Sequence, residues 1–233
     1  PFDNAKIRQA AMIALDQRDF LEAAIGDSRY FATCKALFTC KTPLATEAGM
    51  ADMLNGNAAK AAALLKEAGY DGTPVVILRP TDLAVLANLA PVAKNQLERA
   101  GFKVDVQSMD WQTVLGRAAK MVPVSEGGWN ALLTAWAQVD ILNPIMMPYL
   151  AANCDKARTG WPCDAAMEKL RDEYARATAP QDRMRIAEAA QVLNAGIVTQ
   201  IPLGEFWGVI AVRSNVVLQH NSMVTIYWGI DKR

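Results

Sequence analysis

The sequence has 233 residues, 52% of them hydrophobic, and its 24 basic residues balance its 24 acidic residues. This length suits one large globular domain or two small ones. The balanced charge predicts no nucleic-acid partner, and no apolar run reaches the ~18 residues that a membrane-spanning helix needs. The chain opens with PFDNAKIRQA, without an initiator Met or a signal peptide, so we expect a processed part of a longer protein.

The N-terminal residues 3–26 are predicted to form one amphipathic helix. Asp3 or Asn4 is suited to cap its start, and Gly26 is suited to end it. Its apolar face would comprise Ile7, Ala11, Ala14 and Leu15. Residues 27–56 show no sustained periodicity, and we predict an irregular segment there.

The middle of the chain alternates between helical and extended patterns. Asn57 and Asp110 are suited to cap two of the predicted helices, and Pro91 should kink the helix between them. The predicted order is helix 57–72, strand 73–79, helix 82–101, strand 102–108, helix 110–120 and strand 129–137. This β-α-β-α-β order predicts three parallel strands with right-handed crossovers, and therefore an α/β fold.

The last third of the chain is predicted to hold two more helices and extended segments. The second helix begins with Pro180, a residue that suits the first turn. The predicted elements are helices 164–178 and 180–200, extended chain 201–217 and a strand at 225–230.

The four cysteines form two local pairs, Cys34 with Cys40 and Cys154 with Cys163. Neither pair has metal-binding spacing, and the single histidine, His220, is distant in sequence, so we predict no metal site. We expect two small disulfide loops and an oxidising compartment such as a periplasm. The alternative is four reduced, buried thiols.

Candidate ligand-binding residues follow the predicted strands, because ligands of open α/β sheets collect beyond the carboxyl ends of the strands. The candidates at these ends are Arg79, Asp110, Gln138 and Asp140. Three of them have a simpler alternative: a helix cap for Asp110, a pair with a surface carboxylate for Arg79, and a turn before Asn-Pro for Asp140. We favour binding for Asp140, because its apolar neighbours leave a carboxylate in need of a cationic or N–H partner.

Trp136 and Trp207 are candidate pocket-lining residues, although the alternative for both is a place in the core. His220 lies in a polar segment and is expected to be solvated. The sequence contains no G-x-S-x-G elbow and no phosphate-binding G-x-x-x-x-G-K-[ST] loop, so we expect no catalytic residue and no cofactor.

Several stretches together resemble one known family. They are PFDNAKIRQAAMIALDQRDFLEAAIG, AAALLKEAGYDG, LAPVAKNQLERAGFKVDVQSMDWQTVLGRAAK, TAWAQVDILNP and IPLGEFWGVIAVRSNVV. Their order and nearly full coverage of the chain resemble the extracellular solute-binding proteins of family 5, the dipeptide- and oligopeptide-binding components of ABC importers.

The resemblance implies a periplasmic-binding-protein-like lobe with a mostly parallel β-sheet flanked by helices. Residues 1–212 would form the C-terminal lobe of a bilobed receptor, and residues 213–233 would be strands that return to the other lobe. The receptor would be periplasmic, with or without a lipid anchor. It would close on a peptide or another small solute and deliver it to ABC permease subunits in the membrane.

The resemblance also implies roles for two residues. Asp140 matches the family aspartate that holds the α-ammonium group of a peptide, although it follows Trp136 by four positions rather than three. Arg79, in the stretch LRP, matches an arginine near the ligand carboxylate. Two alternatives from other classes are an α/β hydrolase or transferase, and a sensor or interaction module on the same fold.

Overall fold

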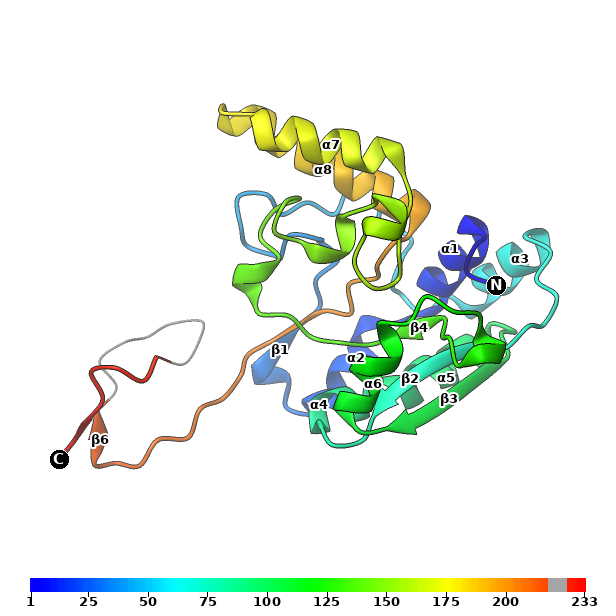
Figure 1. Ribbon diagram of the computed structural model, residues 1–233. Coiled ribbons are helices and arrows are strands. Elements are labelled where there is room, and N and C mark those ends of the chain that lie inside the picture. Colours follow the sequence, from blue (N-terminus) through cyan, green and yellow to red (C-terminus); the bar gives the residue numbers. More distant parts are fainter. Residues whose placement is uncertain (218–225) are drawn as a thin grey trace.

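A computed structural model describes residues 1–217 and 226–233, and its centre is a three-stranded sheet (Figure 1). The strands β2 (Val75–Pro80), β3 (Val104–Met109) and β4 (Ala131–Leu132) lie in the order β3-β2-β4. Both neighbouring pairs are parallel, which confirms the predicted parallel α/β arrangement. The run of β-branched and apolar residues in β2 is buried on both faces, as expected for a central parallel strand.

Strand β4 is much shorter than the predicted strand 129–137, and Pro80 gives the physical reason. Val75 and Thr81 donate backbone hydrogen bonds to β3 or its flanks, whereas the carbonyl of Val76 accepts from Asn130 on the β4 side. Even-numbered residues of β2 therefore face β4. Pro80 faces the same way but has no N–H group, so the ladder between β2 and β4 ends there.

Helices cover both faces of the sheet (Figure 1). On one face, Val76 and Leu78 of β2 pack against Val114 and Ala118 of α6 (Trp111–Ala118). On the other face, Val75 and Ile77 join the main core with α1 (Ala5–Ala14), α3 (Ala58–Glu67) and α5 (Leu89–Arg99). The caps predicted at Asn4, Asn57 and Asp110 are confirmed, since each side chain accepts a hydrogen bond from a backbone N–H of its helix.

The prediction of one helix over residues 3–26 is wrong, because the chain forms α1 and then a separate α2 (Gln17–Ala24). Leu15 and Asp16 are extended between them. The backbone N–H of Asp16 donates to the side chain of Gln96, and Asp16 also forms a β-bridge with Asn55. The Asp16 carboxylate then caps α2 by accepting from the N–H of Arg18.

The helix predicted over residues 82–101 is also divided, into α4 (Ala84–Ala87) and α5. The break is at Asn88, three residues before Pro91, rather than a kink at Pro91 itself. Pro91 thereby falls in the first turn of α5, where its missing N–H costs no helical hydrogen bond.

The predicted pair of C-terminal helices is confirmed as α7 (Ala165–Arg176) and α8 (Pro180–Ile197), with Pro180 in the first turn. The two helices lie side by side, away from the sheet (Figure 1). They enclose a second core, whose buried members are Leu37, Phe38, Met147, Leu150, Ala152, Met167, Ala187 and Ala190.

Short elements connect these layers. Strands β1 (Phe31–Ala32) and β5 (Glu205–Phe206) pair antiparallel. The 3₁₀ turns are η1 (Ser28–Tyr30), η2 (Val124–Glu126), η3 (Gln138–Asp140), η4 (Pro148–Leu150) and η5 (Cys154–Lys156). Both predicted disulfides are present, Cys34–Cys40 and Cys154–Cys163.

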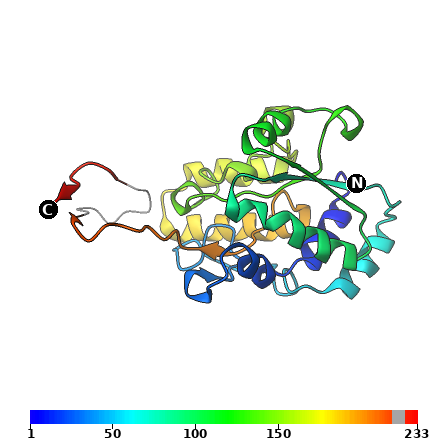
Figure 2. The same ribbon diagram turned by 90° about the horizontal axis from the view of Figure 1, so that it is seen from below.

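After Trp207 the chain leaves the body and reaches a small antiparallel pair, β6 (Val216–Val217) and β7 (Asp231–Lys232), as both views show (Figures 1 and 2). The strand predicted at 225–230 is wrong in its described part, because Trp228 and Gly229 form a turn with a positive φ of 72° at Gly229. His220 lies outside the described residues. Within the described ranges, no helix combines the length and the apolar character that crossing a membrane requires.

Candidate ligand-binding site

Arg79 and Asp110 lie at the carboxyl ends of two neighbouring strands, as predicted. Arg79 is the register partner of Ser108, and Asp110 directly follows β3. Within the part of the chain that the structure describes, no hydrogen bond or ion pair joins Arg79, Asp110 and Asp140. The sheet edge therefore places two of the candidates near each other, while their role in binding stays a prediction.

Arg79 has a structural task at the break between α4 and α5. In a continuous helix, residue 91 would donate its N–H to the carbonyl of Ala87, but Pro91 has none to donate. The Nε of Arg79 donates to this carbonyl instead, at 2.8 Å. The half-buried guanidinium thus supplies the hydrogen bond that Pro91 withholds, and its terminal nitrogens make no hydrogen bond to the residues that the structure describes.

We expect Arg79→Met to lower the free energy of unfolding by about 1–2 kcal/mol, because the Ala87 carbonyl loses its charged donor. In a Pro91→Ala background the new N–H at residue 91 can donate to the Ala87 carbonyl. Arg79→Met should therefore lower the free energy of unfolding by less in this background. Urea unfolding of the four proteins in this double-mutant cycle measures the difference. An equal cost in both backgrounds would show that the bond to Ala87 is not what Arg79 contributes.

Asp110 serves as the N-cap of α6, which was the simpler of its two interpretations. Its carboxylate accepts from the hydroxyl of Thr113 at 2.5 Å and from the backbone N–H of Thr113 at 3.0 Å. These hydrogen bonds hold the pKa of the Asp110 carboxyl below its usual range. The side chain is exposed and ionised, so it lends negative charge to this edge of the sheet.

The segment after β4 carries the other predicted polar residues, Gln138 and Asp140, both in η3. The side-chain amide of Gln138 donates to the hydroxyl of Thr39 at 3.2 Å and ties η3 to the first disulfide loop. The turn that follows is stabilised by Asn143, whose side chain accepts from the N–H groups of Ile145 and Met146. Asp140 is exposed, so the expectation that its apolar neighbours enclose the carboxylate is wrong. The carboxylate makes no hydrogen bond or ion pair within the described ranges.

Trp136 lies in an aromatic cluster that the sequence did not predict. Its ring meets the ring of Tyr149 edge-on, with centroids 5.8 Å apart. The guanidinium carbon of Arg158 lies 4.8 Å from the Trp136 ring centre and 5.8 Å from that of Tyr149. Tyr149 and Arg158 were missed because three separate loops bring the cluster together, and loops have no periodic pattern.

Trp207 is the other predicted aromatic candidate, and it directly follows β5. Its backbone N–H donates to the carbonyl of Tyr30 at 2.8 Å, directly after the β1–β5 pair. Half of its surface, 50%, is exposed, so it does not belong to the core. Its predicted contact with a ligand is not tested by these contacts.

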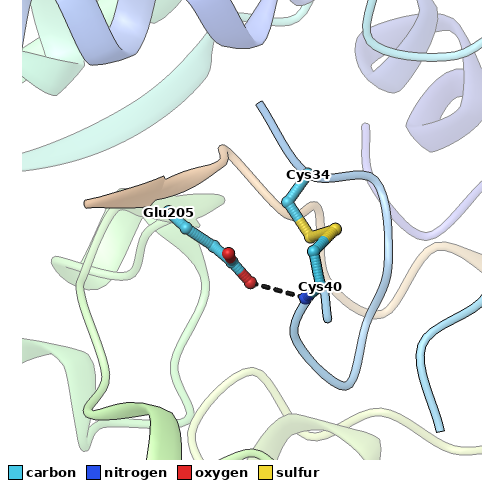
Figure 3. Close-up of side chains that lie close together, drawn as sticks. All are labelled: Cys34, Cys40 and Glu205. Atoms are coloured by element: carbon cyan, nitrogen blue, oxygen red, sulfur yellow. Dashed lines mark hydrogen bonds between the residues drawn. A yellow bond between two sulfur atoms is a disulfide. The ribbon is translucent and has the colours of Figure 1, made fainter. Parts of the chain in front are cut away.

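Glu205 fixes the first disulfide loop against β5 (Figure 3). Its carboxylate accepts from the backbone N–H of Cys40 at 2.7 Å. The side-chain ligand atoms of Cys34, Cys40 and Glu205 lie within 4.8 Å of one another, a spacing that could hold a metal ion. Because the two sulfurs are bonded to each other, they offer no thiolate, and this group acts as a structural anchor for Thr39 and η3.

A surface hollow of about 690 Å³ lies beside α6 and η2. Its lining residues are Gln107, Thr113, Gly116, Arg117, Lys120, Val124, Glu126 and Gly127. None of the six predicted ligand residues lines it. The candidate site is therefore an open edge made by the strand ends and the loops after β4.

Comparison with known proteins gives a consistent result. Residues 1–157 match the family described as bacterial extracellular solute-binding proteins, family 5 middle. A probable peptide ABC transporter periplasmic-binding protein from Sinorhizobium fredii is 31% identical over 206 residues, which are 88% of this chain and 39% of that protein.

Two solved structures share the fold. The ABC transporter substrate-binding protein CtaP from Listeria monocytogenes has a TM-score of 0.74 at 18% identity, over 88% of this chain and 41% of that chain. A dipeptide-binding protein from a Pseudoalteromonas species, solved with Met-Leu, has a TM-score of 0.69 at 19% identity, over 88% of this chain and 40% of that chain. The chain thus spans about two-fifths of the length of these proteins.

Proposed function

Because the chain belongs to the bacterial extracellular solute-binding proteins of family 5, we propose that it forms one lobe of an ABC importer receptor for a peptide or a similar amine-bearing solute. The family consists of binding proteins that work outside the cytoplasm. The receptor would act in the periplasm and hand its solute to permease subunits in the membrane. It would catalyse no reaction of its own.

The observation that carries this proposal is the state of Asp140. Its carboxylate is exposed and without a partner among the described residues, on a 3₁₀ turn that Gln138 and Asn143 hold from either side. Neither a helix cap nor a turn uses this carboxylate. A ligand ammonium group would provide a charge-assisted hydrogen bond of the kind that fixes the orientation of a peptide.

Residues 1–212 would form the lobe, and residues 213–233 would continue into a second lobe. Exposed apolar side chains lie after Trp207 on both sides of this boundary, and they support the continuation into a second lobe rather than the exact boundary. Val209 is 68% exposed, Ile210 57% and Tyr227 75%. Exposed apolar side chains of this kind are suited to pack against another part of a larger protein.

Closure of two lobes would trap the solute, because only the closed form makes both sets of contacts. The lobe by itself should therefore bind solute weakly. A receptor that holds a peptide by its terminal groups, with water filling the side-chain pockets, would accept many sequences.

We expect Asp140→Asn to weaken binding of the dipeptide Ala-Phe by about 10- to 100-fold, because the ammonium group loses a charged partner. NMR titration of the chain, which detects millimolar affinities, measures this change. N-acetyl-Ala-Phe, which carries no ammonium group, should bind weakly to the wild type and the variant alike.

Asp172→Asn is the matched control. It removes the same charge from an exposed aspartate of α7, whose carboxylate pairs with the exposed Arg176. Its affinity for Ala-Phe should equal that of the wild type. If N-acetyl-Ala-Phe binds as well as Ala-Phe, Asp140 does not capture an amine.

A further inference from the structure

We propose that Arg158, supported by Trp136 and Tyr149, binds the terminal carboxylate of the solute. This inference rests on the proposed function and names a group on the ligand that the function leaves open. Trp136 precedes η3, Tyr149 lies in η4, and Arg158 lies in the Cys154–Cys163 disulfide loop. The cluster therefore combines three loops that all follow β4.

Two aromatic rings position the guanidinium of Arg158. Among the residues that the structure describes, it makes no hydrogen bond or ion pair, and its contacts are with the two rings at 4.8 Å and 5.8 Å. A cation–π contact uses none of the five N–H donors of an arginine. These donors remain available to an incoming oxyanion.

Arg171 and Arg117 differ from Arg158 in this respect. Arg171 bonds to Glu168 and to the carbonyl of Pro144. Arg117 donates to the carbonyls of Gly127 and Gly128. Arg158 is exposed and lies against two aromatic rings, and a guanidinium in this state can bind a carboxylate with two parallel hydrogen bonds.

Trp136 and Tyr149 add two further donors to the same cluster. The Trp136 Nε1 is buried and has no hydrogen-bond partner within the described residues, and the Tyr149 hydroxyl also makes no hydrogen bond there. A buried N–H without an acceptor is unfavourable and rare in folded proteins. The cluster thus contains guanidinium, indole and phenol donors, and a negatively charged oxygen group would bring an acceptor to it.

The cluster and the candidate for the ammonium group belong to the same stretch of chain after β4. Asp140 follows Trp136 by four residues and bears the free carboxylate that we assign to the ammonium group. Arg79, the arginine that family resemblance favours, has its Nε bonded to the carbonyl of Ala87. Arg158 has no such commitment, so the geometry favours it for the carboxylate.

The test follows the indole N–H signal of Trp136 by NMR during titration of the chain with Ala-Phe, Ala-Phe amide and Ala-Glu amide. The signal is assigned with Trp136→Phe. We expect it to move with Ala-Phe, and we expect Ala-Phe amide to bind about 10- to 100-fold more weakly. In Arg158→Gln the two ligands should bind equally weakly, and Arg158→Lys should restore only part of the difference, because an ammonium lacks the planar pair of donors.

Arg183→Gln is the matched control, since Arg183 also lies against an aromatic ring, that of Tyr174 at 5.6 Å, on α8. It should leave all titrations unchanged. If Ala-Phe moves other signals while acid and amide bind equally, Arg158 has no such role and the receptor function stands. A response to Ala-Glu amide alone would overturn the assignment to the terminal carboxylate. If none of the three ligands moves any signal, peptide capture by this lobe is overturned together with the inference.

Discussion

Replacing Gly128 with alanine is expected to lower the free energy of unfolding by about 3 kcal/mol or more. Gly128 is buried, and a Cβ atom there would overlap the carbonyl oxygen of Val122 and lie 2.8 Å from atoms of the Pro123 backbone. No non-bonded carbon approaches a backbone oxygen so closely, so the backbone around residue 128 must shift.

A shift at Gly128 would disturb several hydrogen bonds of the turn between α6 and β4. Its N–H donates to the carbonyl of Pro123 at 3.0 Å. Arg117 donates to the carbonyls of Gly127 and Gly128 at 2.6 Å and 2.9 Å. The turn therefore cannot open to admit a methyl group without losing these contacts.

Gly116→Ala is the matched control and should raise the free energy of unfolding rather than lower it. Gly116 lies inside α6, and a Cβ there would meet nothing within 4 Å. Alanine restricts the unfolded chain and favours the helix, so we expect a gain of about 0.5–1 kcal/mol. Urea unfolding of both variants gives the comparison, and a neutral Gly128→Ala would mean that this turn adapts.

The second large effect is expected for Gln17→Leu, which should lower the free energy of unfolding by about 3 kcal/mol. The side chain of Gln17 is 1% exposed and joins three segments. Its amide donates to the carbonyls of Cys34 and Pro202, at 2.6 Å and 2.8 Å, and its oxygen accepts from the N–H of Cys34 at 2.8 Å. Leucine would fill much of the volume but leave these backbone groups buried without partners, and each such group costs about 1–3 kcal/mol.

Gln181→Leu provides the comparison for Gln17→Leu. Both glutamines lie in the first turn of a helix, Gln181 in α8 and Gln17 in α2. Gln181 is exposed, whereas Gln17 is buried. The change at residue 181 should stay within about 0.5 kcal/mol. Similar losses in the two variants would argue that glutamine at a helix start, rather than the buried network, is what matters.

Local signals in the sequence predicted the parts of the fold that depend on local physics. The helix starts at Asn57, Asp110 and Pro180 were predicted correctly, because a cap or a first-turn proline acts within four residues. The break at Asp16 depends on Gln96 and Asn55, which are distant in sequence, so helical periodicity alone continues through it. Pattern reasoning treats such a segment as one helix because it cannot see the competing partner.

The residues of the candidate site also fall into those that the sequence predicted and those that only the structure revealed. Asp140 and Trp136 stood out because their neighbours in the sequence made them unusual. Tyr149 and Arg158 became candidates only when the loops were placed against Trp136. The bond from Arg79 to the carbonyl of Ala87 was equally out of reach, since it depends on how α4 docks against the end of β2.

The two disulfides each join cysteines that are close in the chain, with separations of 6 and 9 residues. Four cysteines allow three pairings, and both wrong pairings would have to close much longer loops at a greater loss of chain entropy. A polypeptide that emerges from its amino end presents Cys34 and Cys40 together, long before Cys154 exists as a competitor. Oxidative maturation of this chain can therefore proceed stepwise in the order of synthesis, with little need for an isomerase to correct it.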